Sequence, residues 1–419
     1  MNSPCRKQWC WCALAVASLA AFSMGQDGQG AFHTSGRISP QWREVHASNV
    51  TNDGVVIGTL LTAGRPVYEA FRWNPQEGFT MLGSLASPSK SVTFQGTPDG
   101  RFIVGHDSST GSTVPVYWRD WQGPFLVLEG QFEVPVDAVG VSLDGETITG
   151  TIYWSASVYE GYVLSKQHGL ETIGHVPGSN RSFGDRLSWD GEVMLTAIMA
   201  PWGQEGARWT RKTGLEALGD LPGGAIFSNL GRCSRDGRVG VGRATPTFDT
   251  PSAARWTEGS GWQDLGGAGA GFGISGDGWV AVGVSGNDAM VWNPIDGMRL
   301  VKDVIEQDFG INLIGWRLRI ALAISDNGRY IAGWGFNPGG TLDDIELWMA
   351  EIPPFCYADC DRSTSNGPDK PPVLDIFDFL CFGNKFNQRD PYANCNNDAH
   401  FDIFDFLCFQ DAFAEGCWK

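Results

Sequence analysis

The sequence predicts an all-β body, a seven-bladed β-propeller, followed by a small α-helical domain held by disulfides. Three observations support this prediction. An Asp-Gly or Asn-Gly turn recurs seven times, the 419-residue chain is rich in glycine (56) and tryptophan (18), and six of the ten cysteines follow residue 355. Abundant glycine and tryptophan suit short strands joined by tight turns, with aromatic side chains packed between sheets.

The repeated turn defines the units of the body. The turn is Asp-Gly in six units and Asn-Gly in the seventh. Its glycine stands at positions 54, 100, 145, 191, 237, 278 and 328, so successive turns are 46, 45, 46, 46, 41 and 50 residues apart. Such dipeptides supply the positive φ angles that a two-residue hairpin needs. A period of about 45 residues is typical of a propeller blade, and we number the units one to seven by these turns.

Each unit repeats the same order of elements. An alternating apolar strand follows the turn, as in VVIG after Gly54, and a later strand contains a tryptophan in six units: Trp73, Trp118, Trp209, Trp256, Trp292 and Trp348. The third unit has GYVL at this place and lacks the tryptophan. A fourth strand follows a glycine, as in GFTMLG. Four strands match one propeller blade, whose faces become buried only when blades stack around a ring.

Two irregularities affect the end of the repeat array. The seventh unit stops near Ile352 without its fourth strand, and residues 36–45 (GRISPQWREV) are the predicted source of the strand that closes the ring. Residues 301–309 (VKDVIEQDF) interrupt the final repeat with the spacing of a helix. We therefore expect one short helix inside the body.

The repeats resemble those of the HAF-repeat extracellular proteins of bacteria. The matching pieces are AFRW at residues 70–73, the A-x-x-x-S-x-D-G turn, the strand ending in Val-Gly and the G-L-x-x-L-G strand, over residues 43–352. The resemblance implies a propeller-like body and carries no catalytic assignment.

The N-terminus predicts export. Arg6 and Lys7 precede an apolar stretch over residues 9–22, and small residues offer cleavage sites after Ala20 or Gly25, so residues 1–25 are a predicted signal peptide. A retained N-terminal anchor is the alternative. No later apolar run approaches the roughly 20 residues of a membrane span, and a net charge of −17 argues against nucleic acid. We expect a secreted or cell-surface protein without a transmembrane segment, with a body over residues 26–352.

The tail, residues 353–419, contains two near-copies of one segment, LDIFDFLCF at 374–382 and FDIFDFLCF at 401–409. Ahead of and within the second copy, oxygen-bearing side chains fall at loop positions 1, 3, 5, 9 and 12, which are Asn394, Asn396, Asp398, Asp402 and Asp405. The backbone carbonyl of His400 is a further candidate at position 7. Calcium prefers six to eight oxygen ligands, so this spacing predicts a calcium loop.

The first copy is less regular. Its matches at positions 1, 3, 9 and 12 are Asp359, Asp361, Asp375 and Asp378. Positions 1 to 12 span 19 residues here (359 to 378) against 11 in the second copy (394 to 405), so eight residues are inserted. Position 5 stays open between Ser363 and Asp369. One or two calcium ions are predicted, and an ordinary solvated acidic face is the alternative.

The paired loop-helix arrangement resembles a dockerin, in particular the cysteine-rich (GC-type) dockerin-like domains at the C-termini of secreted bacterial proteins, over residues 356–419. The resemblance implies one calcium ion per half and a cohesin-type partner. The residues at the partner-recognition positions are Ile376, Phe377, Ile403 and Phe404. The sequence departs from the dockerin pattern at Asn394, which replaces the first Asp, and at Ala399, which stands at position 6.

Six cysteines in an exported domain of this size predict three disulfides. Cys356 and Cys417 bracket the tail and are expected to pair with each other. The remaining four pair either within or between the two halves: Cys360, Cys381, Cys395 and Cys408. Zinc is the rival interpretation, although no paired C-x-x-C spacing is present. Six phenylalanines at helical spacing are predicted to pack between the two helices: Phe379, Phe382, Phe386, Phe406, Phe409 and Phe413.

No strong catalytic motif emerges. None of the six histidines stands in an H-E-x-x-H arrangement, and most repeat aspartates already have a turn role. The favoured hypothesis is a non-enzymatic propeller that binds a glycan or a protein and is held at a surface or complex by its calcium-dependent tail. The alternatives are a carbohydrate-active enzyme, whose carboxylates converge at the central channel and whose tail recruits it to a polysaccharide-degrading assembly, and a structural envelope protein.

Overall fold

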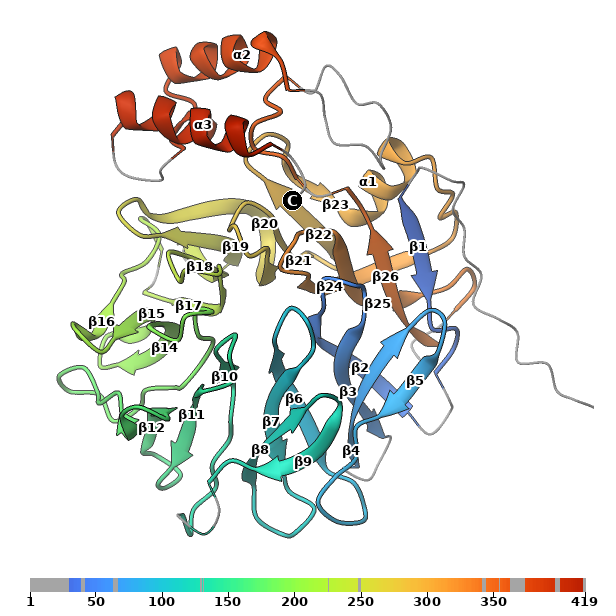
Figure 1. The fold of residues 1–419 in the computed structure, drawn as a ribbon, viewed down its shortest axis with the longest axis vertical. Coiled ribbons are helices and arrows are strands. Elements are labelled where there is room, and N and C mark those ends of the chain that lie inside the picture. Colours follow the sequence, from blue (N-terminus) through green and yellow to red (C-terminus); the bar gives the residue numbers. More distant parts are fainter. Residues whose placement is uncertain are drawn as a thin grey trace, which may run out of the picture.

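The computed structural model describes residues 30–38, 42–62, 67–128, 130, 132–224, 226–247, 250–340, 344–353, 355–361, 374–395 and 400–416. The predicted signal peptide, residues 1–25, lies outside the described residues. The body consists of antiparallel sheets that radiate around a central axis, with two helices of the tail at one edge (Figure 1).

The first three sheets have four strands each, hydrogen-bonded in chain order. One sheet contains β2 (Trp42–Val50), β3 (Val56–Thr62), β4 (Tyr68–Asn74) and β5 (Gly78–Met81). The next contains β6 (Ser91–Gly96), β7 (Phe102–Asp107), β8 (Val114–Arg119) and β9 (Gln122–Leu126). The third contains β10 (Gly140–Val141), β11 (Thr147–Tyr153), β12 (Tyr159–Ser165) and β13 (Gly169–Thr172).

The remaining sheets differ in size. A three-stranded sheet contains β14 (Val193–Ala200), β15 (Gly203–Thr210) and β16 (Gly214–Ala217). A seven-stranded sheet contains β17 (Ser228–Cys233), β18 (Val239–Thr247), β19 (Thr250–Thr257), β20 (Gly261–Ile274), β21 (Ala281–Ser285), β22 (Asp288–Asn293) and β23 (Gly297–Leu300). The last sheet contains β1 (Ala31–Thr34), β26 (Ile345–Glu351), β25 (Tyr330–Phe336) and β24 (Arg317–Ile324).

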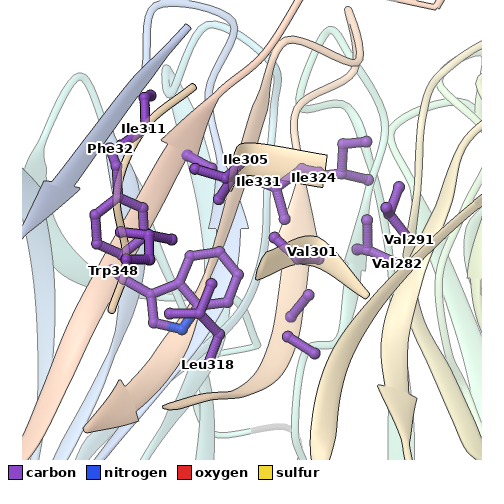
Figure 2. Packing of buried hydrophobic residues seen from close by; sticks show 14 of the residues in the cluster. Phe32, Val282, Val291, Val301, Ile305, Ile311, Leu318, Ile324, Ile331 and Trp348 are labelled. Atoms are coloured by element: carbon purple, nitrogen blue, oxygen red, sulfur yellow. The ribbon is translucent and has the colours of Figure 1, made fainter. Parts of the chain in front are cut away.

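Helices are few in the described residues. The body contains α1 (Val301–Asp308), and the tail contains α2 (Ile376–Asn387), the short 3₁₀ helix η1 (Pro391–Ala393) and α3 (Ile403–Glu415). The prediction of a helix over residues 301–309 is confirmed. Val301 and Ile305 of α1 are both 1% exposed, so the helix packs into the core that Figure 2 shows beside the last sheet.

The repeated turn has the same hydrogen bonds in every unit. In the fourth unit the Ser188 hydroxyl donates to Asp190 Oδ1 (2.6 Å), and Gly191, at φ +79°, donates its N–H to the Ser188 carbonyl (3.0 Å). The equivalent hydroxyl-to-side-chain bond recurs in the other six units. The turn role predicted for the repeat Asp residues is therefore confirmed. The prediction of a two-residue hairpin is wrong, because in the first unit five residues separate β2, which ends at Val50, from β3, which begins at Val56, and Gly54 but not Asp53 has a positive φ.

The strand that pairs with the last sheet comes from earlier in the chain than predicted. β1 pairs with β26, with Phe32 opposite Ala350. The prediction that residues 36–45 supply this strand is wrong, because residues 42–45 belong to β2 in the next sheet, and Ile38 and Val45 pack in its core. Figure 2 shows the ring of Phe32 beside Trp348, and this buried contact gives the short β1 its place.

A buried carboxylate, Asp137, stabilises the third sheet. The Thr151 N–H donates to its Oδ1 (2.7 Å) and the Tyr153 hydroxyl donates to its Oδ2 (2.8 Å). Asp137 is 6% exposed, and burial raises its pKa to about 6 because these hydrogen bonds only partly offset the lost hydration.

This raised pKa predicts a pH dependence of stability. Asp137 has a pKa of about 4 in the unfolded chain, so its favourable contribution is complete below that pH and is lost as the pH rises through 6. Between pH 4 and pH 7 we expect wild type to lose about 2 kcal/mol more than Asp137→Asn, which keeps a hydrogen-bond acceptor but does not ionise. Urea denaturation of both proteins at each pH measures the difference, and parallel profiles would contradict the assignment.

Candidate functional site

Both tail helices begin with a capping box. Asp375 accepts from the Phe377 N–H (2.7 Å), and the Asp375 N–H donates in return to Asp378 Oδ2 (2.8 Å). The second helix repeats this arrangement with Asp402 and Asp405, at 2.9 and 3.0 Å. Reciprocal bonds of this kind satisfy backbone donors at a helix start. They also bring Asp378 and Asp405, both fully buried, to the ends of the two predicted metal loops.

The two halves of the tail are related by an approximate two-fold axis. Each residue of α2 corresponds to the residue of α3 that is 27 positions later in the chain, as Ile376 does to Ile403. A two-fold axis exchanges these residues, so it converts one ring pair into another whose centroid distance should be the same. The Phe379–Phe409 and Phe382–Phe406 centroids lie 5.2 and 5.1 Å apart, while Phe382 and Phe409, which map onto each other, stack at 4.2 Å. The prediction that these phenylalanines pack between the helices is confirmed.

The same symmetry extends to the loops. Tyr357 and Tyr392 each donate a hydroxyl hydrogen bond to the backbone carbonyl of the other. They begin the matching segments Tyr-Ala-Asp-Cys and Tyr-Ala-Asn-Cys, so Asp359 of the first loop corresponds to Asn394 of the second. The described starts of the two loops, residues 357–361 and 392–395, therefore occupy equivalent places on either side of the axis.

Three of the four carboxylates predicted for the first loop come together. Oxygens of Asp359, Asp361 and Asp378 all lie within 4.8 Å of one another, a spacing that could hold a metal ion. Burial, with the neighbouring Asp361 carboxylate, raises the pKa of Asp378. Asp375, the fourth predicted ligand, is outside this cluster and caps α2 instead.

The second loop is described only in part. Asn394, at position 1 of the loop, is half-buried, Asp402 caps α3 and Asp405 is fully buried. His400 lies just before the helix. Asn396 and Asp398, the predicted ligands at positions 3 and 5, lie outside the described residues, as do Ser363 and Asp369 of the first loop.

The disulfides answer the question of pairing that the sequence left open. Cys360 pairs with Cys381, and Cys395 pairs with Cys408, so each bond joins a loop to the helix of the same half. Cys356 is also disulfide-bonded. Cys417, its predicted partner, lies outside the described residues.

The helices expose a symmetric set of apolar side chains, which we call the apolar face: Ile376 (64% exposed), Phe377 (58%), Leu380 (55%), Ile403 (64%), Phe404 (61%) and Leu407 (47%). Four of these are the residues predicted at recognition positions. Leu380 and Leu407 were missed, although their i+4 spacing from Ile376 and Ile403 signalled the shared helix face. Within each helix the three side chains are neighbours at i, i+1 and i+4, and exposed apolar surface of this kind commonly marks an interaction site.

The tail also contacts the body. Trp279, which follows the turn of the sixth unit, stacks on Tyr357 with centroids 4.3 Å apart and an interplanar angle of 16°. Ile295 of the body packs against the same tail core. The aromatic column that joins the two halves of the tail therefore continues onto the edge of the body.

The central axis contains a narrow cavity of about 40 Å³. Six units each contribute one equivalent residue to its lining, the residue two positions before the Ser or Thr whose hydroxyl bonds to the turn side chain. These are Asn49, Gln95, Arg186, Arg232, Gly273 and Ala323. Asp326 closes one side, accepting hydrogen bonds from Trp189 Nε1 (2.8 Å) and Arg235 Nη2 (2.7 Å). Among the described lining residues, Asp326 is the single carboxylate. A cavity of this volume has room for a few water molecules.

Solved structures of similar shape identify the architecture of the body. An oligogalacturonate lyase from Vibrio parahaemolyticus matches with a TM-score of 0.51 at 10% identity, covering 80% of this chain and 97% of that one. An oligogalacturonate lyase in complex with manganese matches with a TM-score of 0.50 at 11% identity, covering 80% and 96%. Both neighbours are β-propeller proteins. The body is a β-propeller.

Other comparisons add little to the propeller assignment. A TolB-type protein from Agrobacterium tumefaciens is 16% identical, covers 57% of this chain and 90% of that chain, and has a TM-score of 0.41. No family model and no curated protein matches the chain. None of the helices in the described ranges is long and apolar enough to span a membrane.

Proposed function

We propose that this protein is a secreted, seven-bladed β-propeller that binds a partner and is held at a surface or in a complex by a calcium-dependent, dockerin-like tail. The observation that carries the proposal is the symmetric apolar face, which adjoins two acidic loops at the starts of α2 and α3. The HAF-type repeats and the predicted signal peptide support an extracellular location.

The count of seven blades rests on the repeat units. In the first three units the turn precedes the second strand of a sheet, and in the fourth it precedes β14, the first strand of the three-stranded sheet. The seven-stranded sheet contains two such turns, one before β18 and one between β20 and β21. The first half of this 14-residue strand pairs with β19 and the second half with β21. We infer that β20 serves two neighbouring blades, and that β1 completes the last one.

The donor set of the first loop fits calcium. Calcium takes hard oxygen ligands at 2.3–2.6 Å, so oxygens on opposite sides of an ion stand about 5 Å apart, which agrees with the spacing of the Asp359, Asp361 and Asp378 oxygens. By symmetry, Asn394 and Asp405 would hold the second ion, with Asn396, Asp398, Asp402 and the His400 carbonyl as the remaining candidates. A bound cation would offset carboxylate repulsion and fix each loop against its helix.

The apolar face supports a protein partner of the cohesin type. Its two halves, Ile376, Phe377 and Leu380 on α2 and their symmetry mates on α3, present the same side chains. Exposed aromatic and aliphatic side chains on a rigid helix pair supply the buried centre of a protein interface. Calcium is required in this scheme because the loops position the first turns of both helices.

The carbohydrate-active alternative has less support. A glycoside hydrolase needs a pair of carboxyl groups roughly 5–10 Å apart in a pocket that admits a sugar ring. The described lining of the central cavity offers Asp326 alone, held by Trp189 and Arg235, in a volume of about 40 Å³. The likeness to the lyase neighbours, at 10–11% identity, shows a shared fold alone.

Calcium titration of the full oxidised chain tests the metal part of the proposal. We expect calorimetric binding of one or two ions, with Asp378→Asn weakening the first-loop site at least tenfold. The asparagine can still accept the Asp375 N–H, so the capping bond survives while the charge is lost. Asp411→Asn, exposed on α3 and outside both loops, is the control. Unchanged affinity in Asp378→Asn would contradict the first-loop site.

Capture of a partner tests the docking part. The full chain, immobilised and exposed to envelope and secreted fractions of the source organism, should retain one partner with calcium and release it with chelator. The double variant Phe377→Ala/Phe404→Ala should lose this partner, and Asn384→Ala/Gln410→Ala, which alters exposed polar positions of the same helices, should keep it. If the partner were retained equally with calcium and with chelator, and equally by wild type and by Phe377→Ala/Phe404→Ala, the docking proposal would be overturned.

A further inference from the structure

The third repeat unit lacks a buried side chain that its neighbours have. In five units a tryptophan stands opposite the first or second residue of the strand that follows the turn, and all five are 0–6% exposed: Trp73, Trp118, Trp209, Trp256 and Trp292. Each packs against the sheet of the preceding unit, as Trp118 does on Ile57 and Leu82. In the seventh unit Trp348 lies two residues earlier in its strand. In the third unit the register places Leu164 there, opposite Ile148.

The smaller side chain leaves the neighbouring residues partly exposed. The residues opposite the tryptophan in the first, second and fourth units, Val56, Ile103 and Met194, are all 0% exposed. Ile148, their equivalent in the third unit, is only half-buried, as is Leu164 itself. The surrounding structure has therefore not collapsed to fill the space.

A cavity of about 380 Å³ occupies this place. It lies between the sheet β6–β9 and the sheet β10–β13, and its apolar walls include Phe102, Val104, Tyr117, Val127, Ile148 and Leu164. Its rim contains three charged residues: Arg119, Glu146 and Lys166. This volume and this mixture of apolar walls with a few polar groups fall in the range of small-molecule sites.

Val127 lines the cavity, and its backbone carbonyl is a hydrogen-bond acceptor in a position that the second unit explains. In the second unit the Trp118 indole N–H donates to the Leu82 carbonyl of the preceding sheet (2.9 Å). Val127 of the second unit is the equivalent of Leu82 of the first. Leu82 directly follows the fourth strand of its sheet, β5, and donates its N–H to the carbonyl of Ala70 in the third strand. Val127 likewise follows β9 and donates its N–H to the carbonyl of Pro115 in β8. The Val127 carbonyl therefore stands where an indole N–H would find its partner.

We propose that this cavity between the second and third units is a binding site for a small planar aromatic molecule of about the size of indole. The same place is filled by an indole ring in five equivalent units, so the flat space between two sheets is already shaped for one. Aromatic rings of Phe102 and Tyr117 offer edge or face contacts to such a ligand. The site lies in the propeller and is independent of the proposed docking role of the tail.

Binding of indole to the full chain tests the proposal. Calorimetry should detect one indole site in wild type, with a rise in melting temperature as indole is added. Leu164→Trp should reduce this binding at least tenfold, because the new side chain occupies the site. The same variant without indole should melt about 2–4 °C higher than wild type, since it fills a cavity. Leu143→Trp adds a tryptophan at an exposed position of the same unit, outside the cavity, and should bind indole normally.

Three results would overturn the proposal. These are no binding of indole to wild type, equal binding to Leu164→Trp, or binding of octanoate in place of indole, which would indicate an acyl-chain site. Leu164→Ala guards against a folding defect in the tryptophan variant, because it enlarges the cavity and should keep indole binding.

Discussion

Phe32→Ala is expected to lower the free energy of unfolding of the propeller by about 3–5 kcal/mol, the usual cost of removing a buried phenylalanine ring. Phe32 is 4% exposed, and its ring centroid lies 5.4 Å from Trp316 and 6.3 Å from Trp348. It also belongs to β1, the strand that joins the N-terminal end of the described body to its last sheet. Truncation therefore leaves a cavity and weakens the contact between the two ends of the repeat array.

Equilibrium denaturation followed by tryptophan fluorescence measures this loss. Phe125→Ala is the matched control, because Phe125 is 44% exposed in β9 and its truncation creates no buried cavity. We expect the control to cost less than about 1 kcal/mol. Equal losses in the two variants would mean that β1 contributes no more to the propeller than a surface strand.

The body was predictable where its signals are local. The Asp-Gly turns, the strands after them and the helix at 301–308 each follow from a few consecutive residues, and the structure has them in the predicted places. The closing strand was assigned wrongly because β1 has four residues and its partner β26 lies more than 300 residues away. A four-residue strand offers little periodicity, and its pairing depends on the ring as a whole.

The tail was predictable in its duplication but not in its packing. The repeated segments located the acidic loops and the two helices, whereas the disulfide pairing depended on which cysteines the two-fold arrangement brings within reach. Leu380 and Leu407 were missed because their exposure depends on which helix face packs inward. The contact of Trp279 with Tyr357 joins a turn of the body to the tail, and no local pattern signals it.

The third unit illustrates a limit of reading repeats. The missing tryptophan was visible in the sequence as GYVL, yet a cavity does not follow from that alone, because a smaller residue often allows neighbouring side chains to move inward. The half-buried state of Ile148 and Leu164 is what distinguishes an open cavity from a repacked core.

Phe382→Ala is expected to destabilise the tail by about 3–5 kcal/mol while leaving the propeller folded. Phe382 is fully buried at the two-fold axis, stacked on Phe409 at 4.2 Å and edge-on to Phe406 at 5.1 Å. A domain of this size has little stability to spare even with its disulfides. The variant should therefore lose both calcium affinity and partner capture, since the acidic residues at the helix starts lose their fixed geometry.

Phe377→Ala is the matched control, because it removes the same side chain from the same helix at a position that is 58% exposed. Its stability and calcium affinity should stay within about 0.5 kcal/mol of wild type, while partner capture falls. Calorimetric unfolding in calcium, in which we expect tail and propeller to melt as separate transitions, gives the stability of each variant. If Phe377→Ala also reduced calcium affinity, the apolar face would be coupled to the metal loops, and loss of capture would no longer separate docking from folding. If Phe382→Ala left both properties intact, the phenylalanine core would not be what holds the loops in place, and the disulfides would have to carry that role.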